Sequence, residues 1–93
     1  MEYLVAVDGS DASEAAVERA CRLASRCDGA VRLVHAVDPS VYANAQAPAD
    51  EDELLQNVEE AEARGEELLA TTADRVRRRD VPVAGTHLRY GEP

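Results

Sequence analysis

The feature that most constrains the fold of this chain is a regular alternation of short apolar runs with longer amphipathic segments. Three runs, at residues 3–7, 30–37 and 83–88 or 83–90, are rich in β-branched side chains and carry few charges. Near-continuous apolar runs of this length are typical of parallel strands covered on both faces. Strands that alternate with helices imply right-handed crossovers. The sequence therefore predicts an α/β fold, a Rossmann-like parallel sheet forming the βαβαβ half of a doubly wound domain.

The first predicted helix begins at Ser10 or Asp11 and ends near Gly29. Either residue can cap it, and Asp11 with Glu14 fits a capping-box pattern. Apolar residues at helical spacing predict its buried face. These residues are Ala12, Ala16, Ala20, Leu23 and Cys27.

The second predicted helix spans residues 50–79, with acids in its first turn and Arg77, Arg78 and Arg79 in its last. The helix macrodipole favours both placements. The arginine run could instead form an anion or nucleic-acid patch, which the acidic composition disfavours. The predicted buried face consists of Leu54, Val58, Ala61, Gly65, Leu68, Thr72 and Val76.

Two segments outside these elements are predicted to be irregular. Residues 40–49, bordered by Pro39 and Pro48, have no hydrophobic period and predict a surface loop long enough to serve as a lid or ligand rim. Residues 91–93, Gly-Glu-Pro, predict a turn and the start of another helix.

Composition limits the classes of partner. The 93 residues suit one domain, and 19 Asp and Glu against 10 basic residues, all of them Arg, give a formal charge of -9. Such a surface repels nucleic acid and anionic membranes, and its self-repulsion is relieved by salt. We therefore expect a halophilic protein, the alternative being an ordinary acidic protein from a genome rich in Arg codons. A core without Phe or Trp is small, and a partner chain would help to stabilise it.

The chain begins without a signal peptide and has no apolar run near the ~18 residues that a membrane span needs, so we expect a cytoplasmic protein.

Cys21 and Cys27 face apart on the first helix and are expected to be packed thiols rather than a disulfide or metal site. His35 and His87 lack a third matched ligand, which favours packed or hydrogen-bonded side chains over metal binding.

Asp8, Gly9 and Ser10 join the first strand to the first helix, at the carboxyl end of a strand, where open α/β sheets bind their ligands. A carboxylate there opposes a phosphate but suits a sugar hydroxyl or a base amine. This turn has one glycine and the chain has no lysine, which excludes the dinucleotide-binding and P-loop motifs. The main chain at Ala36 could read an adenine edge. Alternatively, Asp8 only braces the turn or caps the helix.

The other strand-end candidates, His35, Asp38, Arg89 and Tyr90, suggest no catalytic set. No Ser or Cys nucleophile stands beside a predicted base. A phosphoacceptor role for Asp8 would need a second acid, an Asp ending the third strand and a Lys, which the sequence lacks. We therefore expect a protein that is not an enzyme.

Three stretches carry a family resemblance: V-A-V-D-G-S at residues 5–10, V-R-L-V-H-A-V-D at 31–38 and Y-G-E-P at 90–93. Together with the long acidic helix, they resemble the universal stress protein (UspA) family over the whole chain. The resemblance implies a stress-response protein, usually dimeric, with a five-stranded adenine-nucleotide alpha hydrolase-like fold that binds ATP in many members. The nucleotide contacts that it implies are Ala6, Val7, Asp8, Gly9, Ser10 and Ala36.

The sequence also departs from the family. ATP-binding members hold ribose and phosphates with a G-x-x-G segment after the fourth strand, which these residues lack. We expect one UspA-like domain over residues 1–93, truncated before the fourth strand: a fragment, a shortened member, or half of a two-chain site. ATP binding would then be weak or absent, and the first strand would be an apolar edge that favours a homodimer. The alternatives are a homodimeric interaction protein without nucleotide and, more remotely, a small flavin or electron-transfer domain.

Overall fold

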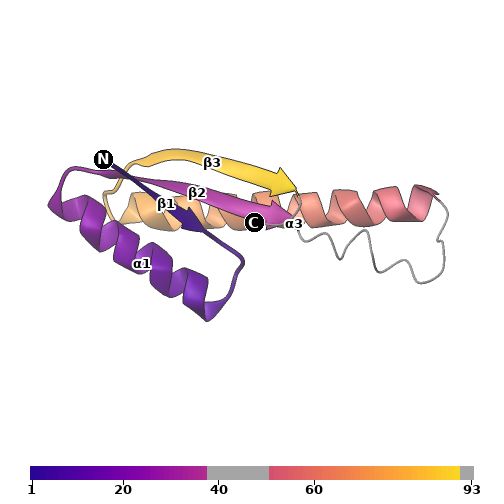
Figure 1. The fold of residues 1–93 in the computed structure, drawn as a ribbon, viewed down its shortest axis with the longest axis horizontal. Helices are drawn as coiled ribbons and strands as arrows, with labels where there is room; N and C mark the ends of the chain where they lie inside the picture. Colours follow the sequence, from indigo (N-terminus) through magenta and orange to yellow (C-terminus); the bar gives the residue numbers. More distant parts are fainter. Residues whose placement is uncertain (38–50, 91–93) are drawn as a thin grey trace.

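The structure, a computed structural model, describes residues 1–37 and 51–90, with the side chains of 51–54 left undescribed. The predicted loop, the predicted turn at 91–93 and Asp38 lie outside the described residues. The elements follow one another as β1 (Glu2–Ala6), α1 (Asp11–Arg26), β2 (Ala30–Val37), α3 (Glu51–Arg78) and β3 (Val83–Tyr90) (Figure 1).

The strands form a parallel sheet in the order β1-β2-β3, which confirms the predicted α/β class. The bounds of β2 and β3 match the apolar runs, whereas β1 begins and ends one residue earlier than expected. Within the described residues, no helix is both long enough and apolar enough to cross a membrane.

Helix α1 begins at Asp11 because Ser10 caps it: the Ser10 hydroxyl accepts the Ser13 N–H at 3.1 Å. The predicted capping box of Asp11 and Glu14 does not form. Asp11 is already helical, and the Glu14 carboxylate pairs instead with Arg75 of α3 at 3.3 Å.

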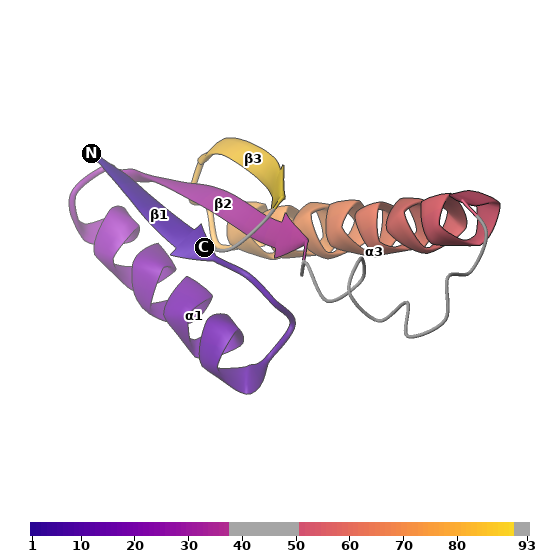
Figure 2. The same cartoon turned by 45° about the vertical axis from the view of Figure 1, so that its right-hand side comes forward.

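Both helices pack on the same face of the sheet (Figure 2). Glu14 and Glu18 of α1 pair with Arg75 of α3 and with Arg79 in the turn directly after it, so the two helices lie side by side. One core joins them to the strands, and its members are Val5, Val7, Val17, Ala20, Cys21, Ala24, Val31, Leu33, Leu69, Ala73, Val76 and Val81.

The expectation that the strands are covered on both faces is wrong for the described residues. Along β1, Val5 is 7% exposed, whereas Leu4 is 68% exposed. The reason is that both helices return over one face, so successive side chains of β1 alternate between the core and the open face.

The predicted buried face of α1 is also wrong, apart from Ala20. The residues that α1 buries are Ser13, Val17, Ala20, Cys21 and Ala24. The exposed Ala12, Ala16 and Leu23 form a second apolar side that lies beside β1. Helical spacing identifies an apolar stripe, but it does not say which of two stripes meets the sheet.

The two cysteines also differ. Cys21 is buried, and burial raises the pKa of its thiol, as expected of a packed side chain. Cys27 is exposed at the end of α1, where its thiol donates to the Leu23 carbonyl at 3.3 Å, so its predicted place in the core is wrong. Both cysteines are free thiols.

The predicted face of α3 is confirmed where the side chains are described. Ala61, Gly65, Thr72 and Val76 are buried, and Val58 and Leu68 are half-buried. Gly65 lets α3 approach the sheet closely, because a Cβ there would come 2.6 Å from His35 Cδ2 and 2.8 Å from Leu88 Cδ1. This contact places α3 directly against His35, next to the predicted site.

Candidate functional site

The turn after β1 is built around the Asp8 carboxylate. Asp8 Oδ1 accepts the Ser10 N–H at 2.8 Å, and the Asp8 N–H donates to Ser13 Oγ at 3.4 Å. Gly9 has a φ of +82°, a conformation that glycine adopts without strain. Asp8 therefore braces this turn, as one of the two sequence interpretations proposed. A carboxylate accepts up to about four hydrogen bonds, so Asp8 keeps acceptor capacity for a ligand.

The environment of Asp8 keeps it anionic. The Ser10 hydroxyl, followed by the Ser10 backbone N–H, holds the pKa of the Asp8 carboxyl below its usual value. Asp8 is exposed to solvent, so its charge is available to a bound molecule. An exposed anion of this kind accepts hydrogen bonds from hydroxyls and amines and repels phosphate.

Ser13 is the site residue that sequence reasoning missed. Its hydroxyl donates to the Ser10 carbonyl at 3.1 Å and also lies 3.4 Å from the Asp8 nitrogen. The spacing of Ser10 and Ser13 could have revealed this link, because a serine three residues after a helix cap faces the cap.

The backbone of Val7 is already engaged within the chain. Its N–H donates to the Val34 carbonyl at 2.8 Å, and its carbonyl oxygen lies 2.6 Å from His35 Nδ1. Because a carbonyl only accepts, Nδ1 must carry the proton. His35 is thus a hydrogen-bonded side chain, as the sequence favoured, and Val7 keeps only the second lone pair of its carbonyl for a ligand.

The sheet brings Asp8 and Ala36 to the same end. Ala6 is the last residue of β1 in register with β2, opposite Val34, and the Val7 N–H donates to the Val34 carbonyl. Asp8 follows directly after this pairing, and Ala36 lies two residues beyond Val34 on β2. Ala36 is half-buried and pairs in register with Arg89 of β3. The carboxyl ends of all three strands therefore meet at this edge.

A second polar cluster, which the sequence did not predict, crosses the open face of the sheet. Arg32 of β2 binds Glu2 of β1 through Nη2 at 3.0 Å, and its Nη1 lies 2.7 Å from His87 Nε2 of β3. Since a guanidinium only donates, His87 Nε2 accepts. The hydrogen bond from Arg32 also lowers the pKa of Glu2. This cluster gives His87 a structural role, and the described residues contain no group of three side chains able to hold a metal.

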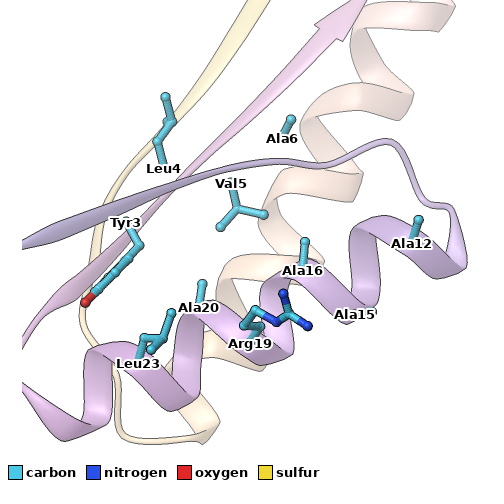
Figure 3. Close-up of a pocket in the computed structure, with 10 residues that line it drawn as sticks. All are labelled: Tyr3, Leu4, Val5, Ala6, Ala12, Ala15, Ala16, Arg19, Ala20 and Leu23. Carbon is cyan, nitrogen blue, oxygen red and sulfur yellow. The ribbon is translucent and has the colours of Figure 1, made fainter.

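An apolar groove of about 650 Å³ is lined by β1 and by the turns of α1 beside it (Figure 3). Leu4 and Ala6 lie on the opposite side of the β1 ribbon from α1, whereas Ala16, Ala20 and Leu23 rise from α1 toward the strand. The lining residues, named here as the β1 groove, are Tyr3, Leu4, Val5, Ala6, Ala12, Ala15, Ala16, Arg19, Ala20 and Leu23.

Comparison with known proteins identifies the family. The model of the universal stress protein family matches residues 2–93. The chain belongs to this family. No curated protein sequence gives a match.

Solved structures agree with this membership. Universal stress protein UspA from Lactobacillus plantarum is 28% identical, with a TM-score of 0.79 over 100% of this chain. A universal stress protein family member from Burkholderia pseudomallei is 25% identical, with a TM-score of 0.74 over 99% of the chain. A universal stress protein from Archaeoglobus fulgidus, at 21% identity and a TM-score of 0.61, shares the fold. The chain spans 62%, 64% and 59% of the lengths of these three chains, respectively.

Proposed function

We propose that this universal stress protein domain binds an adenine nucleotide of the ATP class in stress tolerance, and that it is a cytoplasmic binding protein rather than an enzyme. The observation that carries the proposal is the exposed, anionic Asp8 just after the carboxyl end of β1, in a parallel sheet whose neighbouring strand β2 carries Ala36 near its own carboxyl end. The site would consist of Ala6, Val7, Asp8, Gly9, Ser10 and Ala36.

In this proposal the nucleoside, not the phosphate, provides recognition. Ribose hydroxyls or a base amine donate to the Asp8 carboxylate, and the main chain at Ala36 pairs with the base. Phosphates gain nothing at Asp8, and the 93 residues contain no G-x-x-G segment to hold them. We therefore expect adenosine, AMP and ATP to bind with similar, weak affinities.

Calorimetric titration of adenosine, AMP and ATP tests this proposal. Asp8→Asn is the informative variant, because the amide keeps an oxygen for the Ser10 N–H while it removes the charge. We expect adenosine to bind about tenfold more weakly to it. Asp74→Asn, an exposed acid on α3, is the matched control and should bind as the parent chain does. Equal binding by the Asp8→Asn and parent chains would refute the role of Asp8.

A second candidate function is a homodimeric interaction protein that binds no nucleotide. The observation that favours it is the β1 groove, which exposes apolar side chains beside β1, a strand that pairs with β2 alone within residues 1–37 and 51–90. The use of the Val7 N–H within the sheet also leaves one donor fewer for a ligand. This function predicts no heat in the nucleotide titrations and a concentration-dependent mass.

A further inference from the structure

We propose that a pocket between α1 and the turn after α3 binds a phosphate dianion, either free or carried by a small molecule. The pocket has a volume of about 370 Å³ and is named here the arginine pocket. Its lining residues are Cys21, Arg22, Ser25, Arg26 and Arg79. None of them lines the β1 groove or belongs to the turn around Asp8, so this inference goes beyond the proposed function and can fail independently of it.

The arginine pocket lies where two elements meet. Arg22 and Arg26 are one helical turn apart on α1, with Ser25 beside them, so their side chains leave the same side of the helix. Arg79 comes from the turn directly after α3 and reaches α1 through its ion pair with Glu18. Three guanidinium groups from two elements therefore line one cavity.

The positive charge of the pocket is not balanced within the chain. Arg22 and Arg26 have no ion-pair partner within residues 1–37 and 51–90, although the chain has 19 acidic residues against 10 arginines. Like charges four residues apart on a helix repel each other. The Ser25 hydroxyl has no hydrogen-bond partner in that part of the chain either. An anionic ligand would supply both the counter-charge and the acceptor.

The floor of the pocket does not compete with an anion. Cys21 is 1% exposed, and burial raises the pKa of its thiol, whereas the Arg79 guanidinium acts in the opposite direction. A neutral thiol therefore lies beneath the arginines. The helix macrodipole favours a cation at the end of α1, but it does not explain why Arg79 joins the arginines of α1 around the same cavity.

The donors of the pocket suit a phosphate group. A guanidinium presents a planar fork of N–H donors that binds two oxygens of a phosphate at once. A phosphate dianion has enough oxygens to accept from several arginines and from a hydroxyl, which a two-oxygen carboxylate does not. The cavity volume lies near the lower end of the range of small-molecule sites, roughly 300–1,000 Å³. This size fits a free phosphate or a small phosphorylated molecule.

The arginine pocket and the Asp8 turn are separate sites. Asp8 precedes α1, whereas Arg26 ends it, and the 16 residues of this helix span about 24 Å. Both helices end where the strands begin, at the end of the sheet opposite to Asp8 (Figure 1). Phosphate at the pocket therefore does not contact a nucleoside at the turn.

Three features oppose the binding of an anion here. The chain has a formal charge of -9, Glu18 competes for Arg79, and Asp28 and Asp80 line a neighbouring hollow that shares Ser25. Acids farther away than ~10 Å are largely screened at 0.1 M salt. We therefore expect binding in the millimolar range, and because the contacts are ionic and exposed, it should weaken as KCl is added.

Two-dimensional NMR of the ¹⁵N-labelled chain, titrated with potassium phosphate, tests the arginine pocket. At about pH 7.5 phosphate is mainly a dianion. Phosphate replaces KCl in the titration so that the ionic strength stays at about 0.1 M. The backbone amide signals of the four polar lining residues should shift together and saturate. Signals that do not move, or that drift without saturating, would overturn the proposal.

Arg26→Gln tests the contact itself. It removes the guanidinium, and phosphate should bind roughly tenfold more weakly. Arg78→Gln removes the same charge from an exposed position in the last turn of α3, outside the pocket, and is the matched control. The control should bind phosphate as the parent chain does. Equal weakening by both changes would mean that only net charge matters and would refute the pocket.

The ion pair between Glu18 and Arg79 provides a test in the opposite direction. Glu18→Gln removes the carboxylate that competes for the Arg79 guanidinium, so phosphate should bind several-fold more tightly. Arginines that only balance the helix dipole predict no such gain. Circular dichroism verifies that each variant is folded. If Glu18→Gln binds no more tightly than the parent chain, Arg79 does not hold the anion and the three-arginine site is wrong.

Glycerol 3-phosphate distinguishes the two sources of the phosphate group. Equal binding of glycerol 3-phosphate and inorganic phosphate, both weakened by Arg26→Gln, identifies a phosphorylated small molecule as an acceptable ligand. Binding of inorganic phosphate alone identifies the free ion. Binding of neither contradicts the proposal. Adenosine carries no phosphate, so it should leave the pocket signals in place, and its titration reports on Asp8 alone.

Discussion

The His35 Nδ1–H donates to the carbonyl oxygen of Val7 at 2.6 Å, and so ties β2 to the residue that precedes Asp8. The His35 ring is in turn held by α3, which passes it at Gly65. The position of the Asp8 turn thus depends on a side chain from β2 and on the close approach of α3.

Replacing His35 should therefore destabilise the fold. His35→Phe keeps an aromatic ring but removes the donor to Val7, and we expect the free energy of unfolding to fall by about 1–3 kcal/mol, because the carbonyl of the buried Val7 loses its partner. Urea denaturation measures the change. Thr86→Val, at an exposed position of β3, should change the stability by less than about 0.5 kcal/mol. Equal effects of the two changes would show that the Val7 bond does not matter.

Gly65→Ala should destabilise the protein even though alanine is the better helix former. The added Cβ would meet His35 Cδ2 at 2.6 Å and Leu88 Cδ1 at 2.8 Å. Overpacking costs typically ~1–3 kcal/mol, against a helix-propensity gain of ~1 kcal/mol. Thermal unfolding should show a lower Tm. Adding Leu88→Ala should recover part of the loss if the clash is the cause, and a raised Tm for Gly65→Ala alone would contradict the packing.

The Asp8 carboxyl should make stability depend on pH in the acid range. Its pKa in the folded state is lowered, so the contribution is present above the unfolded value of ~3.9 and is lost as pH falls through the folded value. Denaturant unfolding from pH 7 down to about pH 3 should therefore show a smaller fall in stability for Asp8→Asn than for the parent chain. If the stability of both chains falls equally with pH, the contacts between Asp8 and Ser10 are not the cause of the pH dependence.

Added salt should stabilise this chain. The net charge of -9 opposes the compact state through repulsion between like charges. The four surface ion pairs among the described residues offset little of this repulsion, because exposed pairs contribute little and are screened by salt. We expect the Tm to rise between 0.1 and about 2 M KCl. A chain with Glu59→Gln, Glu66→Gln and Glu67→Gln, all exposed acids of α3, should be more stable at low salt and gain less from KCl. Identical salt responses would refute charge repulsion as the cause.

The sequence predicts what repeats along the chain, and it misses what depends on tertiary placement. Strand and helix order follow from the apolar runs, and the buried face of α3 follows from its spacing. The face of α1 does not, because α1 has two apolar sides and only the sheet selects Val17 and Cys21 over Ala16 and Leu23.

For the candidate site, the sequence likewise predicts the local turn but not the side-chain contacts between distant elements. Asp8, Gly9 and Ser10 follow from their place between a strand and a helix. The contacts of Ser13 with Ser10 and of His35 with Val7, like the cluster of Glu2, Arg32 and His87, depend on side chains that meet only after folding. A single sequence gives no spacing rule for such long-range pairs.

The most direct measurement of nucleoside binding at the Asp8 turn is a titration of the ¹⁵N-labelled chain with adenosine, followed by two-dimensional NMR. The account predicts that the backbone amide signals of Asp8, Gly9, Ser10 and Ala36 shift together and saturate, while those of Ala16 and Leu23 in the β1 groove stay in place. Signals that do not move at millimolar adenosine, or that move in the groove and not at the turn, would contradict it.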